Sequence, residues 1–361
     1  MRIVIFGLTV SSSWGNGHAA LWRGLISALG ADGHQVSFFE RDQPFYAQAR
    51  DLHEIRGGEL VIYPDWRAIL PRARQALAGA DVAIVTSYCP DGVAATTLVM
   101  EAAVAVRCFY DMDTPVTLAR LAGGEPLPYI GPQQLGGFDV VLSYTGGQAL
   151  DELRTRLGAR RVVPLYGWAD TMHYQPGDAQ PHYAAALSYI GTYAADRQKA
   201  LEELFVEPAR RRPARRFVIA GAQYPASFPW LSNIYFVRHL PPAEHRSFYA
   251  SSRLTLNVTR SAMARMGFCP SGRLFEAAAC ATPVLSDWWV GLDSFFTPGD
   301  EILIAGTVEQ AIAALDLPAE RLRAIGRRAR ERVLEEHSAR HRAQQMLAAL
   351  HDPQLGAAQA A

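Results

Sequence analysis

LTLNVTR at residues 254–260 and GFCPSGRLFEAAACATPVLSD at residues 267–287 are the most informative stretches of the sequence. Together they predict a strand, a loop, a helix and a second strand. The apolar run that begins at Leu254 is typical of a buried strand, and the Leu, Phe and Ala residues after Gly272 are typical of a helix. A second apolar run follows Pro283. This succession is the repeating unit of a parallel sheet, so the stretch predicts an α/β fold.

Short apolar runs alternate with longer amphipathic stretches on both sides of this segment, which indicates two series of β-α units. The first series holds predicted strands at residues 3–6, 36–39, 60–63, 82–85, 106–110 and 140–142. The second series holds predicted strands at residues 187–190, 217–220, 234–237, 254–258, 283–286 and 302–304. We therefore expect two Rossmann-like, doubly wound domains that face a cleft, with a ligand at the carboxyl ends of the strands.

The best boundary between the two series is the stretch from Val163 to Pro181, which is punctuated by Pro and Gly and has no periodicity. We expect an amino-terminal domain at residues 1–171 and a carboxyl-terminal domain at residues 172–350. Residues 351–361 are expected to form a weakly patterned tail. A length of 361 residues agrees with two domains.

Composition excludes several classes of protein. The 35 Lys and Arg residues balance the 35 Asp and Glu residues, so no overall charge favours nucleic acid as a partner. The four cysteines form no C-x-x-C pair, which counts against a zinc cluster and a disulfide framework. No apolar run approaches the roughly 20 residues of a membrane span, and no export signal is recognisable at the start, so we expect a cytoplasmic protein without a membrane span.

A polar loop, GLTVSSSWGNGH at residues 7–18, follows the first predicted strand and precedes a helix. Gly15, Asn16 and Gly17 would let backbone N–H groups at the helix start approach an anion or a polar ligand. The loop lacks the G-x-G-x-x-G fingerprint, which disfavours a nicotinamide enzyme. Two alternatives stay open: the loop simply caps the helix, and His18 is either a base or a polar residue of the first turn.

Two acids, Asp111 and Asp113, follow the strand that ends at Tyr110. Because residues two apart on an extended chain point the same way, both carboxylates could face one ligand. Alternatively, Asp113 or Thr114 caps a helix whose first residue is Pro115. We infer no metal from this pair.

The start of the helix in the 267–287 stretch has the features of a phosphate site. Free N–H groups at Ser271 and Gly272, with the guanidinium of Arg273, could bind a diphosphate. Glu276 lies in an otherwise apolar helix, where a carboxylate is costly unless it is paired or binds ligand hydroxyls. A salt bridge between Glu276 and an arginine is the alternative.

These residues resemble a known family. The segment from Arg273 to Asp287, with Gly291 and FFTPGDEI at residues 295–302, resembles the carboxyl-terminal domain of GT-B glycosyltransferases, and more narrowly the CgeB-like, spore-maturation type. GNGH at residues 15–18, GHQVSFFERD at residues 33–42 and YDMDTP at residues 110–115 have counterparts there. The resemblance covers nearly the whole chain, and its carboxyl-terminal part is the specific one.

The resemblance implies roles for residues of the second domain. Glu276 would hold the ribose of the donor nucleotide, and Ser271, Gly272 and Arg273 would lie near its diphosphate. Arg197 would be a phosphate contact and Tyr224 would lie at the nucleobase, with solvent exposure as the alternative for both. The chain departs from the pattern of many retaining GT-B enzymes, because the position eight before Glu276 is Phe268 and not glutamate. The stereochemistry therefore stays open.

The resemblance implies a metal-independent, hexosyltransferase-like glycosyltransferase that needs no cofactor. A nucleoside diphosphate sugar, expected to be a UDP-sugar, would bind mainly to the carboxyl-terminal domain. Its acceptor would be an unidentified small molecule, glycan or protein. Asp113, His18 and Asp111 are the candidate catalytic residues, and Asp113 or His18 would be the base if the reaction inverts. The alternatives are a sugar-nucleotide epimerase or hydrolase and a non-catalytic protein that binds sugar nucleotides.

Overall fold

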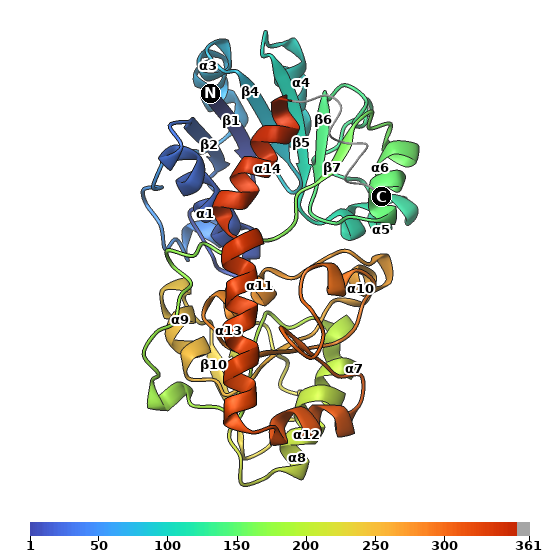
Figure 1. Cartoon of the computed structure of the whole chain (residues 1–361). Coiled ribbons are helices and arrows are strands. Elements are labelled where there is room, and N and C mark those ends of the chain that lie inside the picture. The colour runs from blue at the N-terminus through green and yellow to red at the C-terminus, as the bar shows by residue number, and fades with distance from the viewer. Residues whose placement is uncertain (352–361) are drawn as a thin grey trace. The chain divides into compact units, whose positions relative to one another are not determined.

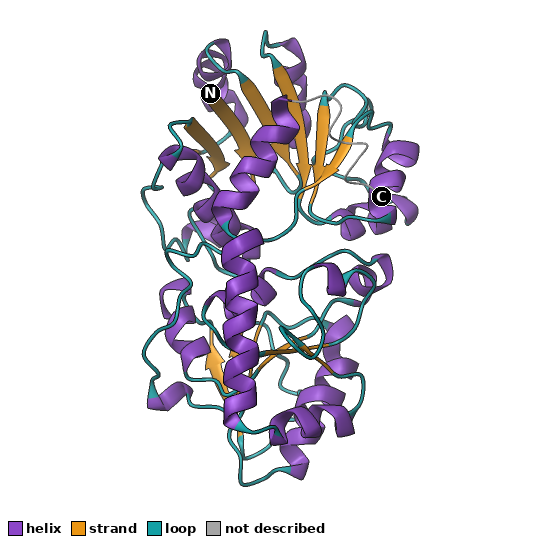
Figure 2. Ribbon diagram, viewed as in Figure 1, coloured by secondary structure: helices purple, strands orange, loops and turns teal. Residues whose placement is uncertain are grey.

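The computed structural model describes residues 1–351, which form two compact units. The first unit consists of Met1–Tyr166 and the C-terminal segment that begins at Ala339, and the second unit is Gly167–Ser338. Both units combine helices with a strand layer (Figure 1, Figure 2). Two α/β units, each built on a parallel sheet, confirm the fold class predicted from the sequence.

The first unit is built on a parallel sheet whose order, within the described residues, is β3-β2-β1-β4-β5-β6-β7. The central strand β4 is buried along its whole length, which explains its continuous apolar run. Strand order reverses between β1 and β4, and ligands of such sheets bind beside this reversal, at the carboxyl ends of the strands. The strands are β1 Arg2–Gly7, β2 Gln35–Arg41, β3 Gly58–Tyr63, β4 Val82–Thr86, β5 Val106–Asp111, β6 Val140–Ser143 and β7 Val162–Pro164.

Helices connect these strands, and one further helix comes from the end of the chain. They are α1 Gly17–Ala31, α2 Pro44–Ala47, α3 Trp66–Ala78, α4 Gly92–Glu101, α5 Thr114–Ala122, α6 Gln148–Leu157 and α14 Ala339–His351. Helix α14 packs against α1 (Figure 1). The buried Arg342 of α14 donates to the backbone oxygen of Tyr166 at 3.2 Å, which ties this last helix to the end of the first series.

The second unit has a parallel sheet with the order β10-β9-β8-β11-β12-β13 among the described residues. Its strand order reverses between β8 and β11, as it does between β1 and β4 in the first unit. The strands are β8 Leu187–Ile190, β9 Phe217–Gly221, β10 Ile234–Arg238, β11 Thr255–Asn257, β12 Val284–Ser286 and β13 Leu303–Ile304.

The helices of the second unit are mostly short, apart from α13. They are α7 Gln198–Leu201, α8 Glu207–Arg211, α9 Pro242–Ala250, α10 Ser261–Met266, α11 Gly272–Ala279, α12 Val308–Asp316 and α13 Ala319–Glu336. Each unit has its own apolar core: one contains Phe6 and Phe109, and the other contains Tyr189 and Phe217. Helix α11 lies against α13, so the helix that the sequence singled out is a core element of the second unit.

The structure differs from the predicted domain limits in two ways. The units change at Gly167 and not at residue 172, because Val162–Pro164 pairs with β6 as strand β7. Helix α14, expected in the second domain, is grouped with the first unit because it packs against α1. Of the predicted tail, only His351 falls within the described residues, as the last residue of α14.

Candidate functional site

In the first unit, a buried carboxylate shapes the loop that follows β1. Glu40, near the end of β2, is 1% exposed. It accepts hydrogen bonds from the Thr9 hydroxyl (2.7 Å), the Val10 N–H (2.7 Å), and both the N–H (2.9 Å) and the hydroxyl (2.5 Å) of Ser11. Because these four donors occupy both oxygens of the carboxylate, Glu40 holds the loop in place. Residues later in the loop are therefore the candidates for contact with a ligand.

The loop ends at His18, whose imidazole lies beside Asp113. His18 Nε2 and Asp113 Oδ2 are 3.2 Å apart, and the two side chains are 16% and 24% exposed. A proton on Nε2 would therefore face the carboxylate, and in that tautomer Nδ1, which makes no hydrogen bond to the described residues, would keep a lone pair. A carboxylate that orients an imidazole in this way is the arrangement of a general base.

Asp113 is also the residue at which the chain enters α5. It occupies the N-cap position, with φ −139° and ψ 49°, and its side chain makes no capping hydrogen bond. Pro115 is the second residue of the helix, one place later than predicted. Asp113 can therefore occupy the cap position and still keep its partly exposed carboxylate available to orient His18.

Asp111 does not share the surface of Asp113, which corrects the expectation that both carboxylates face one ligand. Asp111 is fully buried, and its Oδ1 accepts from the Asp113 N–H and the Thr117 hydroxyl, each at 3.1 Å. Burial raises the pKa of Asp111 to about 6, and the hydrogen bonds from Thr117 and Asp113 oppose this rise. Asp111 therefore fixes the turn that positions Asp113 and has no surface beside it that a ligand could reach.

Tyr88 is a neighbour of this pair that sequence reasoning missed. It follows β4 in a left-handed conformation with φ 62°, and its ring centroid lies 6.0 Å from that of His18 and 5.3 Å from that of Tyr129. Such a backbone conformation is uncommon for a bulky residue, and it is often found at functional sites. SYCPDG at residues 87–92 is a turn signal that could have drawn attention to this position.

The three loop residues predicted to approach the donor have different structural roles. Asn16 caps α1, because its Oδ1 accepts from the His18 N–H at 3.1 Å, so this side chain is already used. Gly15 and Gly17 are exposed, and nothing lies within 4 Å of a Cβ placed on either. The two glycines therefore leave open space beside His18, and a contact with the donor stays a prediction.

In the second unit, Arg273 joins the two strands at which the order reverses. Its Nε donates to the Ile190 backbone oxygen at the end of β8, and its Nη1 donates to Asn257 Oδ1 at the end of β11, at 2.5 and 2.9 Å. The guanidinium also lies over the Tyr189 ring, 4.9 Å from its centroid. These contacts fix Arg273 and leave Nη2 without a hydrogen-bond partner among the described residues, so Nη2 can bind an anion.

The N-terminus of α11 lies beside this guanidinium. Ser271 occupies the N-cap position and makes no side-chain capping hydrogen bond, so N–H groups of the first turn, at Gly272 and Arg273, have no side-chain acceptor. Gly191 lies close to Arg273, because a Cβ there would be 2.8 Å from Nη2. The combination of uncapped N–H groups and a fixed cation is the arrangement that binds phosphate.

Glu276, one turn further along α11, lies among tyrosines. The Tyr249 hydroxyl donates to Glu276 Oε2 at 3.4 Å. Burial raises the pKa of Glu276, and the positive charge of Arg273 and hydrogen bonds from Tyr174 and Tyr249 oppose this rise. The residue keeps partial exposure. The predicted salt-bridge alternative is not observed, since no arginine lies within ion-pair distance of Glu276 among the described residues.

Arg197 and Tyr224 lie near Arg273, but contacts within the unit already use them in part. Arg197 Nη2 donates to the Thr192 backbone oxygen at 2.6 Å, and the Tyr224 hydroxyl donates to the Gly191 oxygen at 3.2 Å. Burial raises the pKa of Tyr224, whereas both arginines lower it, so the three side chains are electrostatic neighbours. Their contacts with a phosphate and a nucleobase stay predictions.

The Tyr224 ring belongs to an aromatic cluster that extends to the surface. Its neighbours, at centroid distances from 5.1 to 5.8 Å, are Tyr193, Phe228, Trp230 and Phe236. These rings hold Tyr224 in place.

The loop before α11 contains Phe268, the residue that replaces the acid of many retaining enzymes. Phe268 has φ 45°, and its N–H donates to the Val290 backbone oxygen at 2.7 Å. A Cβ at Gly291 would lie 2.5 Å from the Phe268 ring, so Gly291 makes room for it. The aromatic side chain is therefore built into the loop.

Residues 1–351 contain no group of three or more His, Cys, Asp or Glu side chains that could hold a metal ion. None of their helices combines the length and the apolar character needed to cross a membrane.

Comparisons with known proteins bear on the fold and on the sequence of the carboxyl-terminal part. Residues 197–348 match a family model described as glycosyl transferase-like. Sucrose-phosphate synthase from Thermosynechococcus elongatus is 16% identical, with a TM-score of 0.70 over 96% of this chain and 97% of that one. An alpha-glucosyltransferase, solved with UDP and a 13-mer DNA, is 12% identical, with a TM-score of 0.71 over 98% of this chain and 100% of that one.

A third similar structure is HepE from Anabaena in complex with UDP-glucose, at 12% identity and a TM-score of 0.64 over 96% of this chain and 98% of that one. No protein of curated function matches the chain in sequence. The chain therefore has the GT-B fold of glycosyltransferases, and its second unit resembles glycosyltransferases in sequence as well. The narrower CgeB-like resemblance stays a prediction.

Proposed function

We propose that this protein is a glycosyltransferase that moves a sugar from a UDP-sugar to the hydroxyl of an acceptor. One observation carries the proposal: Arg273 is fixed at the strand-order reversal of the second unit, beside the uncapped start of α11. The family match of residues 197–348 and the UDP-glucose bound by the similar HepE support a sugar nucleotide as the ligand.

The second unit would bind the donor and stabilise the leaving group. Negative charge builds up on the diphosphate as the sugar departs, and the Arg273 guanidinium and the N–H groups of α11 would stabilise it. Because these groups are already held in place, little reorganisation is needed when the charge develops. Glu276, one turn along the same helix, would accept hydrogen bonds from the ribose hydroxyls.

The first unit would supply the base for a single displacement. His18 Nδ1 would take the proton of the acceptor hydroxyl while its oxygen forms the bond to the anomeric carbon. The bond between this carbon and the diphosphate oxygen breaks, and UDP leaves with the electron pair. Asp113 would keep Nε2 protonated and would stabilise the imidazolium. In this proposal the Arg273 guanidinium and the N–H groups of α11 would offset the charge on the leaving diphosphate without a metal ion.

Direct titration tests the donor site. Calorimetric titration of UDP and UDP-glucose into the wild type should give saturable binding, and Arg273→Gln should weaken it about tenfold or more, because a charge-assisted hydrogen bond is lost. Arg327→Gln is the matched control, since it removes an exposed guanidinium of α13 and should leave the affinity unchanged. The proposal fails if the folded wild type binds neither nucleotide, or if both variants weaken binding equally.

Release of UDP from UDP-glucose distinguishes an enzyme from a binding protein. With water or an added glycan as the acceptor, the wild type should release UDP, and His18→Gln should release it far more slowly. A protein that binds UDP-glucose tightly and releases no UDP with any acceptor would instead be a non-catalytic sugar-nucleotide binder.

A further inference from the structure

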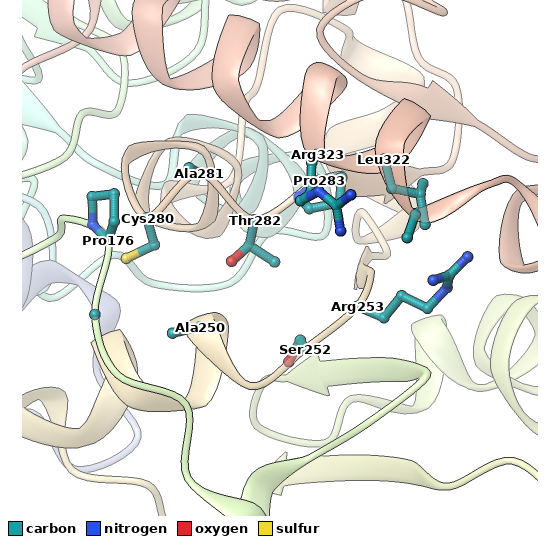
Figure 3. A pocket seen from close by; sticks show the side chains of 12 residues that line it. Pro176, Ala250, Ser252, Arg253, Cys280, Ala281, Thr282, Pro283, Leu322 and Arg323 are labelled. Atoms are coloured by element: carbon teal, nitrogen blue, oxygen red, sulfur yellow. The ribbon is translucent and has the colours of Figure 1, made fainter.

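The second unit has a cavity at the edge of its sheet opposite to the candidate donor site. Ser252 and Arg253 lie just before β11, and Thr282 and Pro283 lie just before β12, so the cavity is at the amino ends of these parallel strands. Its volume is about 320 Å³. Figure 3 shows its lining side chains. Since Arg273 and the start of α11 lie beyond the carboxyl ends, the cavity is separate from the donor site.

The charges on the cavity wall are positive. Arg253 and Arg323 are among the 12 residues that line it, and none of these residues is acidic (Figure 3). Arg253 Nη2 donates to the Leu317 backbone oxygen, which anchors this side chain. Arg323 is exposed and makes no ion pair or hydrogen bond to residues 1–351, so its guanidinium can contact a ligand.

Two nearby carboxylates do not neutralise this wall. Asp316, at the end of α12, is bound by Arg212 at 2.6 Å and by Arg215 at 2.7 Å. Glu320 is exposed in the first turn of α13 and is not a lining residue. Neither Arg253 nor Arg323 forms an ion pair with a carboxylate of residues 1–351, and the exposed Asp178, which follows the lining residue Gly177, is itself not a lining residue.

The first turn of α13 adds to this positive potential. The helix has 18 residues and begins at Ala319, which lines the cavity together with Leu322 and Arg323. Its N-cap residue is Pro318, which makes no side-chain capping hydrogen bond. Free N–H groups and the helix dipole at such an end favour an anion. The helix end and two guanidiniums thus act on the same cavity.

The remaining wall is uncharged and firmly held. Ser252 and Thr282 already donate their hydroxyl protons to the backbone oxygens of Phe248 and Tyr249, at 2.9 and 2.8 Å. The other lining residues include Pro176, Ala250, Ala281, Pro283 and Leu322. A Cβ at Gly326 would lie 2.2 Å from the Ala281 oxygen, so α13 approaches this wall closely and fixes its shape. Such a wall suits the uncharged part of a small organic anion.

We infer that this cavity is a binding site for the phosphate group of a phosphorylated small molecule, held by the guanidiniums of Arg253 and Arg323. A phosphate group matches two guanidiniums in charge and in hydrogen-bonding geometry. The site is distinct from the proposed donor site and does not depend on UDP binding.

The test is a calorimetric titration in phosphate-free buffer with inorganic phosphate, glucose 1-phosphate and glucose. Binding of a phosphorylated probe should be saturable and should weaken about tenfold or more in Arg323→Gln, because one charge-assisted hydrogen bond is lost. Arg323 is exposed and unbonded, so this variant should fold. Arg327→Gln, one turn further along α13, should bind as the wild type does. Tighter binding of glucose 1-phosphate than of inorganic phosphate would identify a phosphorylated metabolite, and equal affinities would identify free phosphate.

A second variant separates this cavity from the donor site. Arg273→Gln should remove only the phosphate that binds at the donor site and should keep the binding that Arg323→Gln weakens, whereas Arg323→Gln should leave the UDP titration unchanged. The inference is overturned if neither phosphorylated probe binds, if glucose binds equally well, or if the phosphate signal is lost in Arg273→Gln and kept in Arg323→Gln.

Discussion

The two units hold the loops beyond their strands by the same means. In the first unit, Glu40 near the end of β2 accepts four hydrogen bonds from Thr9, Val10 and Ser11. In the second unit, Asp287 follows β12 and accepts from the N–H and the hydroxyl of Thr259, at 3.1 and 3.0 Å. In both units a carboxylate at one strand end fixes the loop that follows a different strand.

The side chains presented beyond these loops differ. The first unit presents an imidazole paired with a carboxylate, His18 and Asp113, whereas the second presents the guanidinium of Arg273 at a helix start. An imidazole can take up a proton, and a guanidinium keeps its charge at all ordinary pH values. The shared carboxylates therefore hold loops in both units, whereas under the proposed function His18 would transfer a proton and Arg273 would bind an anion.

The largest expected effect tests this division of roles. His18→Gln should lower UDP release from UDP-glucose by about 10²–10⁴-fold, the usual contribution of a general base, because the amide cannot take up the proton. Its UDP affinity, measured by calorimetry, should equal that of the wild type. A variant that loses UDP affinity and catalysis together would show that the imidazole also belongs to donor binding.

A smaller effect should separate the two scaffold carboxylates. Glu40→Gln should cost about 3 kcal/mol of unfolding free energy, because its amide NH₂ would face N–H or hydroxyl donors in a fully buried place. Asp287→Asn should cost about 1–2 kcal/mol, since Asp287 is only partly buried and its donors come mainly from one residue, Thr259. Urea unfolding of both variants measures the difference, and equal costs would contradict the ranking.

The pH dependence of stability gives the third prediction. The native pKa of Asp111, about 6, exceeds its usual value of 3.8, so the native state holds a proton that the unfolded chain releases in this range. Stability contributed by this site is therefore present below about pH 4 and is lost as the pH rises to about 6. Between pH 4 and pH 7, the free energy of unfolding of Asp111→Asn should therefore rise relative to that of the wild type by at most about 3 kcal/mol.

Urea unfolding at both pH values measures this gain. The exposed Glu101→Gln is the matched control and should follow the wild type. A constant difference between Asp111→Asn and the wild type at both pH values would contradict the assignment.

Most strands were predictable because they are apolar runs bounded by polar turns. Residues 187–190 form β8 as predicted, and the other predicted strands overlap observed ones within one or two residues at each end. Strand β7, Val162–Pro164, was missed because it is short and lies where Pro and Gly become frequent. The position of α14 was missed because helical periodicity shows that a segment has an apolar face but not which unit covers it.

The candidate site was predictable in its residue types and not in its contacts. His18 and Asp113 are far apart in sequence, and they meet because β1 and β5 flank β4 in the sheet. The sequence argument for Asp111 and Asp113 assumed an extended chain, but Asp113 already has the conformation of a helix cap, so the two side chains diverge. Likewise, Arg273 was predicted at a helix start, whereas its partner at Ile190 depends on strand order.

Helix α14 has a consequence for the order in which the protein is completed during synthesis. The ribosome makes all seven strands of the first unit before it makes any residue of the second, yet the helix that covers α1 is translated after the second unit has been made. Until α14 is translated, the first unit therefore lacks the helix that packs against α1. A nascent chain stalled after Ser338 contains every residue of the second unit and lacks α14 of the first.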